Sequence, residues 1–119
     1  VNTKELGTIG ESIACDTLRN KGYAILRRNY IFNKAEVDII AEKDGKLIFV
    51  EVKTRISSYL TDPSLLVSVG KQKQIIRAAD QYVKDFYPDM EWRFDIMVVI
   101  TNSEYTSIEH IEDAFYPMV

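Results

Sequence analysis

Cysteine, histidine and long hydrophobic runs are scarce in this 119-residue chain. The single cysteine, Cys15, cannot form a disulfide within the chain, which is typical of a reducing compartment. The longest apolar runs, 47–50 and 96–100, are far shorter than the roughly 20 residues that cross a bilayer. Residues 1–9 have neither the basic start nor the apolar stretch of a secretory signal. We therefore expect a cytoplasmic protein that does not associate with a membrane.

The composition is typical of one folded domain. Hydrophobic residues make up 46% of the chain and aromatic residues 11%, which is enough apolar surface to bury a core. The sequence contains no internal repeat, no low-complexity tract and no Gly-, Pro- and Ser-rich linker. Single cores commonly span about 100 to 150 residues, so we predict one domain over residues 1–119.

Charge is distributed unevenly along the chain. The net charge of −3 argues against nucleic-acid binding, because proteins that bind nucleic acids usually present a basic surface. However, residues 1–80 carry 13 Lys and Arg against 10 Asp and Glu, whereas residues 81–119 carry 2 against 8. A bound cation would also neutralise some acids of the first part. A locally positive surface is therefore compatible with the net charge.

The spacing of apolar residues predicts an α/β fold with a mixed central sheet flanked by helices. Helical spacing before Gly22 indicates a helix that ends in a left-handed cap. Residues 55–69 include Pro63 and show no clear period, so we expect a long loop there. The predicted order is α-β-β-β-α-β-β, with helices at 4–21 and 71–86 and strands at 23–32, 35–41, 46–54, 92–101 and 107–111.

The Asp44-Gly45 pair predicts a tight hairpin turn, because both central residues of the favoured turn need positive φ. A two-residue turn would pair Lys43 with Lys46, and the same register then places Asp38 opposite Glu51. Side chains alternate between the two faces of a strand. One face would carry Glu36, Asp38, Glu51 and Lys53, and the other Val37, Ile39, Val50 and Val52.

Asp38 and Glu51 would repel each other in this register. Carboxylates about 5 Å apart repel by roughly 3 kcal/mol at an effective dielectric near 20. A divalent cation with oxygen ligands would offset that cost, and Mg²⁺ is typically held by one or two carboxylates. Such a cation can activate water and polarise a phosphoryl oxygen, and Lys53 would add a positive group beside it. This arrangement suits phosphodiester hydrolysis.

A solvated sheet face is the alternative. Glu36 and Lys53 would then form an ordinary cross-strand ion pair worth less than about 1 kcal/mol. Phe49 lies on the same predicted face as Glu51 and is unusual on a fully wet surface, which favours a covered site. The spacing alone leaves both interpretations open.

The segments around these residues resemble the acid and (D/E)-x-K motifs of the PD-(D/E)XK restriction-endonuclease-like superfamily. More narrowly, the sequence resembles the YraN-type family (UPF0102), which is similar to archaeal Holliday-junction resolvases. The matching motifs are Glu36-Val37-Asp38 and Phe49-Val50-Glu51-Val52-Lys53-Thr54-Arg55, with further matches at Gly10-Glu11, Ala14, Leu18, Gly22-Tyr23, Ile25-Leu26, Arg28-Asn29, Lys71, Arg93-Phe94-Asp95 and Ile108-His110-Ile111-Glu112-Ala114-Phe115.

The resemblance implies a mixed central sheet flanked by helices, in the restriction-endonuclease-like arrangement, and a role for each matching residue. Asp38 and Glu51 match the ligands of a Mg²⁺ or Mn²⁺ ion, and the Val52 carbonyl matches a main-chain ligand. Lys53 matches the catalytic lysine. Glu11 matches the helix glutamate that completes such sites in resolvase-like members.

The expected function is metal-dependent cleavage of DNA, on branched or otherwise structured substrates in repair or recombination. Cutting two strands favours a homodimer, by analogy alone. The alternative is a non-catalytic nucleic-acid-binding accessory module that keeps the fold. The phosphate contacts that we expect are Arg28, Arg55, Lys71 and Lys73.

Three further polar residues in the C-terminal part are predicted to be structural. Arg93 and Asp95 lie two residues apart on a predicted strand, so they would form a pair on one face. His110 has no partner that the sequence reveals.

Overall fold

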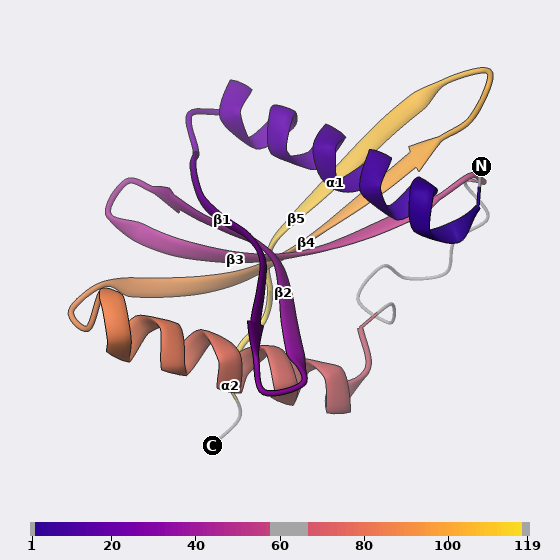
Figure 1. Ribbon diagram of the computed structural model, residues 1–119. Coiled ribbons are helices and arrows are strands. Elements are labelled where there is room, and N and C mark those ends of the chain that lie inside the picture. Colours follow the sequence, from indigo (N-terminus) through magenta and orange to yellow (C-terminus); the bar gives the residue numbers. More distant parts are fainter. Residues whose placement is uncertain (1, 58–66, 118–119) are drawn as a thin grey trace.

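The computed structural model of the protein describes residues 2–57 and 67–117. One mixed sheet has the strand order β1-β2-β3-β4-β5, with α1 against one face and α2 against the other (Figure 1). Strands β3 and β4 are parallel, because α2 crosses between them, and the other neighbours are antiparallel. The elements are α1 (Thr3–Asn20), β1 (Ala24–Phe32), β2 (Ala35–Lys43), β3 (Lys46–Arg55), α2 (Val69–Phe86), β4 (Glu91–Thr101) and β5 (Thr106–Phe115). The predicted fold class and element order are confirmed.

Local sequence signals fix the ends of both helices. The Asn2 side chain accepts a hydrogen bond from the Glu5 amide at 2.8 Å and so caps α1, and Ser68 caps α2 through the Lys71 amide at 3.2 Å. Gly22, with φ of +92°, follows α1 in the left-handed conformation that its position predicted. The predicted loop at 55–69 is shorter at both ends, because β3 includes Arg55 and α2 begins at Val69. Its central part, 58–66, lies outside the described residues.

The sheet separates two hydrophobic cores. The core beneath α2 contains Phe49, Phe94 and Tyr82, and the core beneath α1 contains Leu18, Val50 and Met97. The prediction that the face carrying Phe49 is covered is therefore confirmed, and the cover is α2. Neither described helix is long and apolar enough to cross a membrane.

A close approach between α1 and β3 occurs at Gly10. A Cβ atom at this position would collide with the side chain of Thr54, near the end of β3. Glycine therefore lets α1 lie directly against the strand that carries Glu51 and Lys53. Both helices begin on the side of the molecule where β3 ends, at the right in Figure 1. The next residue of α1, Glu11, is thereby brought to the same end of the sheet.

Candidate functional site

The predicted register between β2 and β3 is confirmed from the turn as far as Ile39, the residue that follows Asp38 in the sequence. Asp44 and Gly45 have φ of +51° and +78°, and the pairs run from Lys43↔Lys46 to Ile39↔Val50. Regular pairing ends there. The Asp38 side chain accepts a hydrogen bond from the Val52 amide at 2.8 Å through Oδ2. The Asp38 carboxylate thus accepts a hydrogen bond from a backbone amide of β3 at the point where the regular pairing of the two strands ends.

Asp38 also interrupts the alternation of side chains along β2. Val37 packs in the α2 core with Phe49, whereas Ile39 packs in the α1 core with Val50. The prediction that Val37 shares a face with Ile39 is therefore wrong. Residues two positions apart in a regular strand point to the same face, so β2 must be irregular between Val37 and Ile39. On β1, the flanking pairs Arg28↔Ile39 and Tyr30↔Val37 bring a residue of positive φ, Asn29, to the level of this irregularity.

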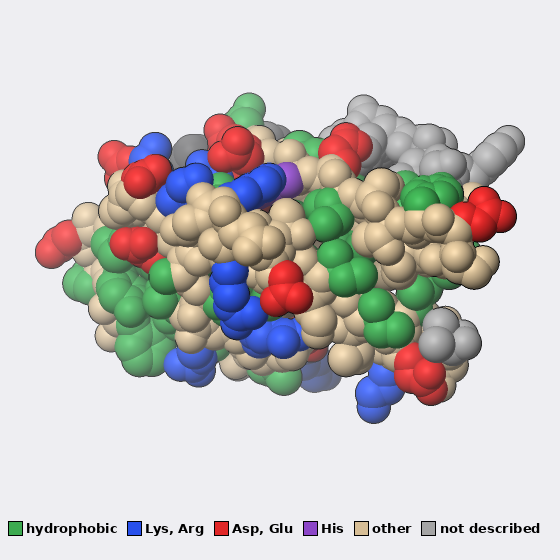
Figure 2. Space-filling model, turned by 90° about the horizontal axis from the view of Figure 1, so that it is seen from above, with side chains coloured by type: hydrophobic (Ala, Val, Ile, Leu, Met, Phe, Trp, Pro, Cys, Tyr) green, Lys and Arg blue, Asp and Glu red, His purple; other side chains and the backbone are tan. Residues whose placement is uncertain are grey.

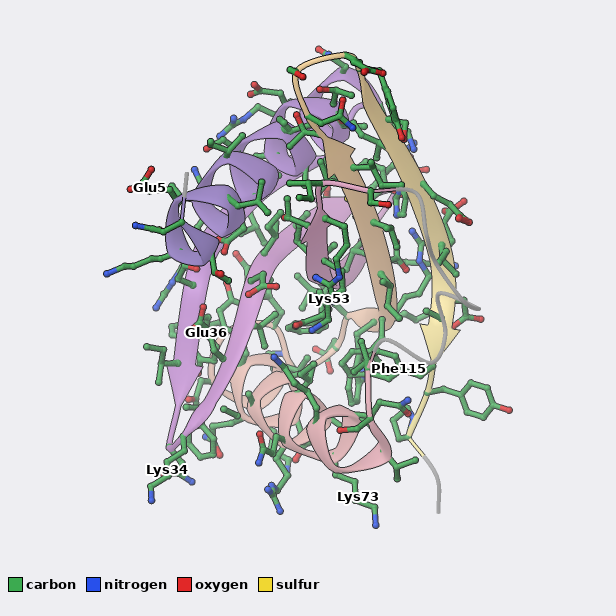
Figure 3. All side chains as sticks on the ribbon, turned by 90° about the vertical axis from the view of Figure 1, so that its right-hand side faces the viewer. Glu5, Lys34, Glu36, Lys53, Lys73 and Phe115 are labelled. Atoms are coloured by element: carbon green, nitrogen blue, oxygen red, sulfur yellow. The ribbon has the colours of Figure 1, made fainter. Side chains whose placement is uncertain are left out.

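The cross-strand ion pair between Glu36 and Lys53, which the alternative of a solvated sheet face predicted, is absent among the described residues. Lys53 lies 3.4 Å from Glu51 instead, and Glu36 faces Asn29. Figure 3 shows Lys53 between α1 and α2 in this view, with Glu36 on a strand to one side. The predicted patch of four charges is therefore divided: Glu51 and Lys53 lie on the face of Phe49, and Glu36 lies toward α1.

Glu51 is a buried carboxylate, and only one of its two oxygens has a partner among the described residues. Its side chain is 3% exposed, and Oε1 lies 3.0 Å from Lys71 Nζ and 3.4 Å from Lys53 Nζ. Among the described residues, Oε2 has no hydrogen-bond partner. A buried acceptor without a partner costs about 1 to 3 kcal/mol, more when charged. The second oxygen of Glu51 is consequently available for a ligand.

Asp38 is electrostatically linked to Glu51. Burial, followed by repulsion from Glu51, raises the pKa of Asp38 to about 7, although the Val52 amide opposes that change. Burial opposes the charge of Lys71, but attraction to Glu51, Asp38 and Glu36 together outweighs it and raises the pKa of Lys71 above its ordinary value. Asp38 therefore resists ionisation beside Glu51, and one lysine is held charged beside the two carboxyl groups.

Glu11 reaches the same electrostatic environment from α1. Burial raises its pKa, Arg28 opposes the shift, and Glu36 and Glu51 add to it. Glu11, Arg28 and Glu36 line a cleft of about 490 Å³ between α1 and the β1–β2 hairpin. Of the other predicted site residues, Asp38 and Glu51 interact electrostatically with Glu11, and Lys53 Nζ lies 3.4 Å from Glu51 Oε1.

The donor set suits a hard divalent cation held by few protein ligands. In the described part of the chain, no three His, Cys, Asp or Glu side chains are already arranged around a common cation position. Mg²⁺ commonly uses only one or two carboxylates and fills its other positions with water and phosphate oxygens. The unpartnered Oε2 of Glu51 and the carboxylate of Asp38, which interacts electrostatically with Glu51, fit that requirement.

The four predicted phosphate contacts are dispersed. Arg28 is exposed at the cleft beside Glu11, and Arg55 is exposed at the end of β3. Lys71 turns inward to Glu51, whereas Lys73 points away from the molecule in Figure 3. Lys71 and Lys73 therefore do not act as one pair. On the face seen in Figure 2, basic and acidic side chains are interspersed.

A second buried carboxylate, Asp95, lies on β4 beneath the α1 side of the sheet. Arg93 donates to both of its oxygens at 2.8 and 2.9 Å, and the Asp113 amide donates at 3.0 Å. The predicted Arg93–Asp95 pair is confirmed. His110 does have partners, contrary to what its sequence neighbours indicated: Nε2 lies 2.7 Å from Asp95 and Nδ1 3.1 Å from Lys21.

The pairing of Lys71 with Glu51 and the contacts of Asn29 were missed from the sequence. Lys71 belongs to the first turn of α2, and no spacing rule connects it to a strand 20 residues earlier. Asp95 offered a usable signal, because a carboxylate within the apolar run of β4 must find donors when it is buried.

The comparisons with known proteins agree on one family. The model of the uncharacterised protein family UPF0102 matches residues 10–99. A UPF0102 protein of Christiangramia forsetii is 46% identical over 112 residues, which cover 94% of both chains. Those of Flavobacterium johnsoniae and Bacteroides thetaiotaomicron are each 43% identical, and the alignments cover 94% and 95% of this chain and 94% and 93% of the relatives. The chain belongs to the UPF0102 family.

Proposed function

We propose that this protein is a Mg²⁺- or Mn²⁺-dependent endonuclease that hydrolyses phosphodiester bonds of DNA. The observation that carries the proposal is the pair of neighbouring carboxylates, Asp38 and Glu51, of which Glu51 is buried with an unpartnered oxygen. The resemblance to the restriction-endonuclease-like superfamily supports the same conclusion. A buried anionic pair is costly for a fold to keep unless a ligand compensates it.

Asp38 and Glu51 would hold the cation, together with the main-chain carbonyl of Val52. When bound, the cation supplies charge neutralisation, a more acidic water and polarisation of the phosphoryl oxygen. Lys53, which already lies 3.4 Å from Glu51, would stabilise negative charge on the attacked phosphate or orient the water. Glu11 would complete the acidic side of the site from α1.

DNA contacts in this proposal come from four basic residues on three elements. Arg28 lies on β1 and Arg55 at the end of β3, and Lys71 and Lys73 lie on the first turns of α2. Such contacts place a backbone without reading its bases, so the preferred substrate would be recognised by shape, as in branched DNA. A homodimer would provide two such sites for the two strands.

A non-catalytic accessory module is the competing function, and one observation favours it. Lys53 and Lys71 both pair with Glu51, so the buried charge is already partly neutralised by the protein itself. In that case, the site would be a structural ion-pair cluster, and nucleic acid would bind without being cut.

Cleavage assays separate the two functions. Purified protein is incubated with linear, flapped and four-way DNA in Mg²⁺ or Mn²⁺, beside the variants Asp38→Asn and Lys53→Ala. Glu109→Gln, an exposed acid on β5, serves as the matched control. We expect cleavage by the wild type and the control, and a loss of about 100-fold or more in both site variants. Binding without cleavage of every substrate, or cleavage by both site variants at the wild-type rate, would contradict the proposal.

A further inference from the structure

Asn29 has a backbone conformation that is uncommon for a residue within a strand. Its φ is +53°, in the left-handed region, which costs most non-glycine residues roughly 1 kcal/mol or more. Asparagine is among the few side chains that tolerate this region. The conformation occurs at the level of Asp38, where β2 is also irregular. Both strands of the hairpin thus depart from regular geometry beside the acidic site.

The Asn29 side chain bridges two carboxylates on different elements. The orientation of the amide that satisfies both of its polar atoms directs Nδ2 to Glu11 Oε1 at 2.9 Å and to Glu36 Oε1 at 3.1 Å. The amide nitrogen has two hydrogens, so it can donate to both acceptors at once. Glu11 belongs to α1 and Glu36 to β2, so one neutral side chain connects the helix to the hairpin.

The bridge opposes the repulsion between the two acids that it contacts. Glu11 and Glu36 are both anionic when ionised, and each disfavours the charge of the other. Without a donor between them, their carboxylates would be expected to move apart. Glycine would retain the backbone conformation but not the donor, and Asn29→Gly therefore removes only the bridge.

We propose that Asn29 is a positioning residue: by bridging Glu11 and Glu36, it fixes the position of Glu11 relative to the cation position formed by Asp38 and Glu51. This inference rests on the proposed function. It assigns to Asn29 no contact with the cation or the substrate. Its effect is exerted through Glu11, which α1 brings close enough to Asp38 and Glu51 to interact electrostatically with both.

The chain offers a close control for Asn29. Asn33 is the same residue type, lies in the turn of the same hairpin and also has a left-handed φ, of +55°. It faces a different cleft, with Lys34 and Arg77. Asn33→Gly therefore reproduces the backbone consequence of Asn29→Gly without removing a bridge between acids.

The test measures Mn²⁺ binding by calorimetry on the full chain, and urea unfolding without the cation. We expect Asn29→Gly to weaken Mn²⁺ binding by about 10- to 100-fold, the range found when partners that orient a ligand are removed. Asn33→Gly should leave affinity unchanged, and the two variants should unfold at similar urea concentrations. Adding Glu36→Gln to Asn29→Gly should restore most of the affinity, because it removes the repulsion that the bridge opposes.

Three outcomes would overturn the inference alone: an Asn29→Gly variant that binds Mn²⁺ as tightly as the wild type, an equal loss in Asn33→Gly, or no rescue by Glu36→Gln. A wild-type protein that binds no Mn²⁺ would remove the proposed function, and this inference with it. The two failures are therefore distinguishable from the same set of titrations.

Discussion

The sheet contains two buried acidic regions, one around Asp95 and one around Glu51, and they differ in how completely their carboxylates are hydrogen-bonded. Asp95 is fully buried, and its oxygens receive hydrogen bonds from Arg93, from the Asp113 amide and from His110 when Nε2 carries the proton. Glu51 is almost as buried, yet one of its oxygens has no partner in the described part of the chain. The Glu51 region contains another acid, Asp38, beside the ammonium groups of Lys53 and Lys71, whereas the Asp95 region contains the guanidinium of Arg93.

In both regions a carboxylate accepts a hydrogen bond from a backbone amide, but the pKa of the carboxyl group shifts in opposite directions. Asp38 accepts the Val52 amide where pairing with β3 ends, and Asp95 accepts the Asp113 amide at a register shift with β5. Bonds from His110, Arg93 and the amide outweigh the burial of Asp95 and lower its pKa, whereas burial and Glu51 raise that of Asp38. One region therefore stabilises the fold when ionised, and the other is stabilised only when a ligand or a proton neutralises it.

Removal of Asp95 should have the largest effect on stability. Asp95→Ala leaves the Arg93 guanidinium and the Asp113 amide without their acceptor, and loss of one partner of a buried pair costs about 3 to 5 kcal/mol. Urea unfolding measures the change, with Glu109→Ala, exposed on β5, as a control expected within about 0.5 kcal/mol of wild type. A loss below about 1 kcal/mol for Asp95→Ala would show that the network is not structural.

Without divalent cations, the acidic pair of Asp38 and Glu51 should make the free energy of unfolding depend on pH. The folded pKa of Asp38, about 7, exceeds its ordinary value of 3.8. The folded state thus binds the proton more tightly, and its stability falls as pH rises from about 4 to about 7. Asp38→Asn removes this loss, so the variant should be more stable than wild type by roughly 2 to 4 kcal/mol at about pH 8, with the difference vanishing near pH 4.

Asp95 should produce the reverse dependence, because its pKa is lowered: its contribution is present above the unfolded value and is lost as pH falls through the folded value. Urea unfolding of wild type and Asp38→Asn from about pH 4 to about pH 8, in the presence of a chelator, tests the sign for Asp38, and unfolding of wild type below about pH 4 tests the sign for Asp95. Parallel stability profiles for the two proteins would mean that Asp38 is not neutralised by its surroundings.

The contact between Gly10 and Thr54 decides how closely α1 delivers Glu11 to the acidic pair. Gly10→Ala forces the helix away from β3 and should cost about 1 to 3 kcal/mol, as other overpacked contacts do. Gly7, on the same helix, has open space around its Cα, so Gly7→Ala should instead stabilise by up to about 1 kcal/mol. Thermal unfolding of both variants checks the prediction, and equal effects would exclude a close packing constraint at Gly10.

The smallest expected effect concerns the outer part of the Asp95 network. The Tyr23 hydroxyl accepts a hydrogen bond from Arg93 at 2.9 Å. Tyr23→Phe should cost about 0.5 to 1.5 kcal/mol, because Arg93 keeps its contacts with Asp95. The exposed Tyr105 provides the matched substitution, Tyr105→Phe, which should be close to neutral in the same urea titration. If both substitutions are equally neutral, Tyr23 does not support the network.

The fold was largely predictable because its signals are local. Apolar spacing located both helices, and the Asp44-Gly45 turn gave the β2–β3 register as far as Ile39. The same register predicted that Asp38 pairs with Glu51, but that pair does not form, because regular pairing ends at Ile39↔Val50. The predicted sheet face of Val37 was wrong, because strict alternation of side chains holds only in a regular strand. At Asp38, a hydrogen bond from the Val52 amide to the side chain replaces regular pairing. The partners of His110 were hidden because they come from β4 and from the end of α1.

The sequence by itself determined the α/β class, the order of elements and the presence of two acids and a lysine on neighbouring strands. These features depend on interactions between residues close together in the chain. Only the tertiary structure decided which charges face one another: Lys71 pairs with Glu51, Asn29 bridges Glu11 and Glu36, and Glu51 retains an unpartnered oxygen. Such contacts depend on how helices pack on the sheet, and a packing distance of a few ångströms leaves no periodic trace in the sequence.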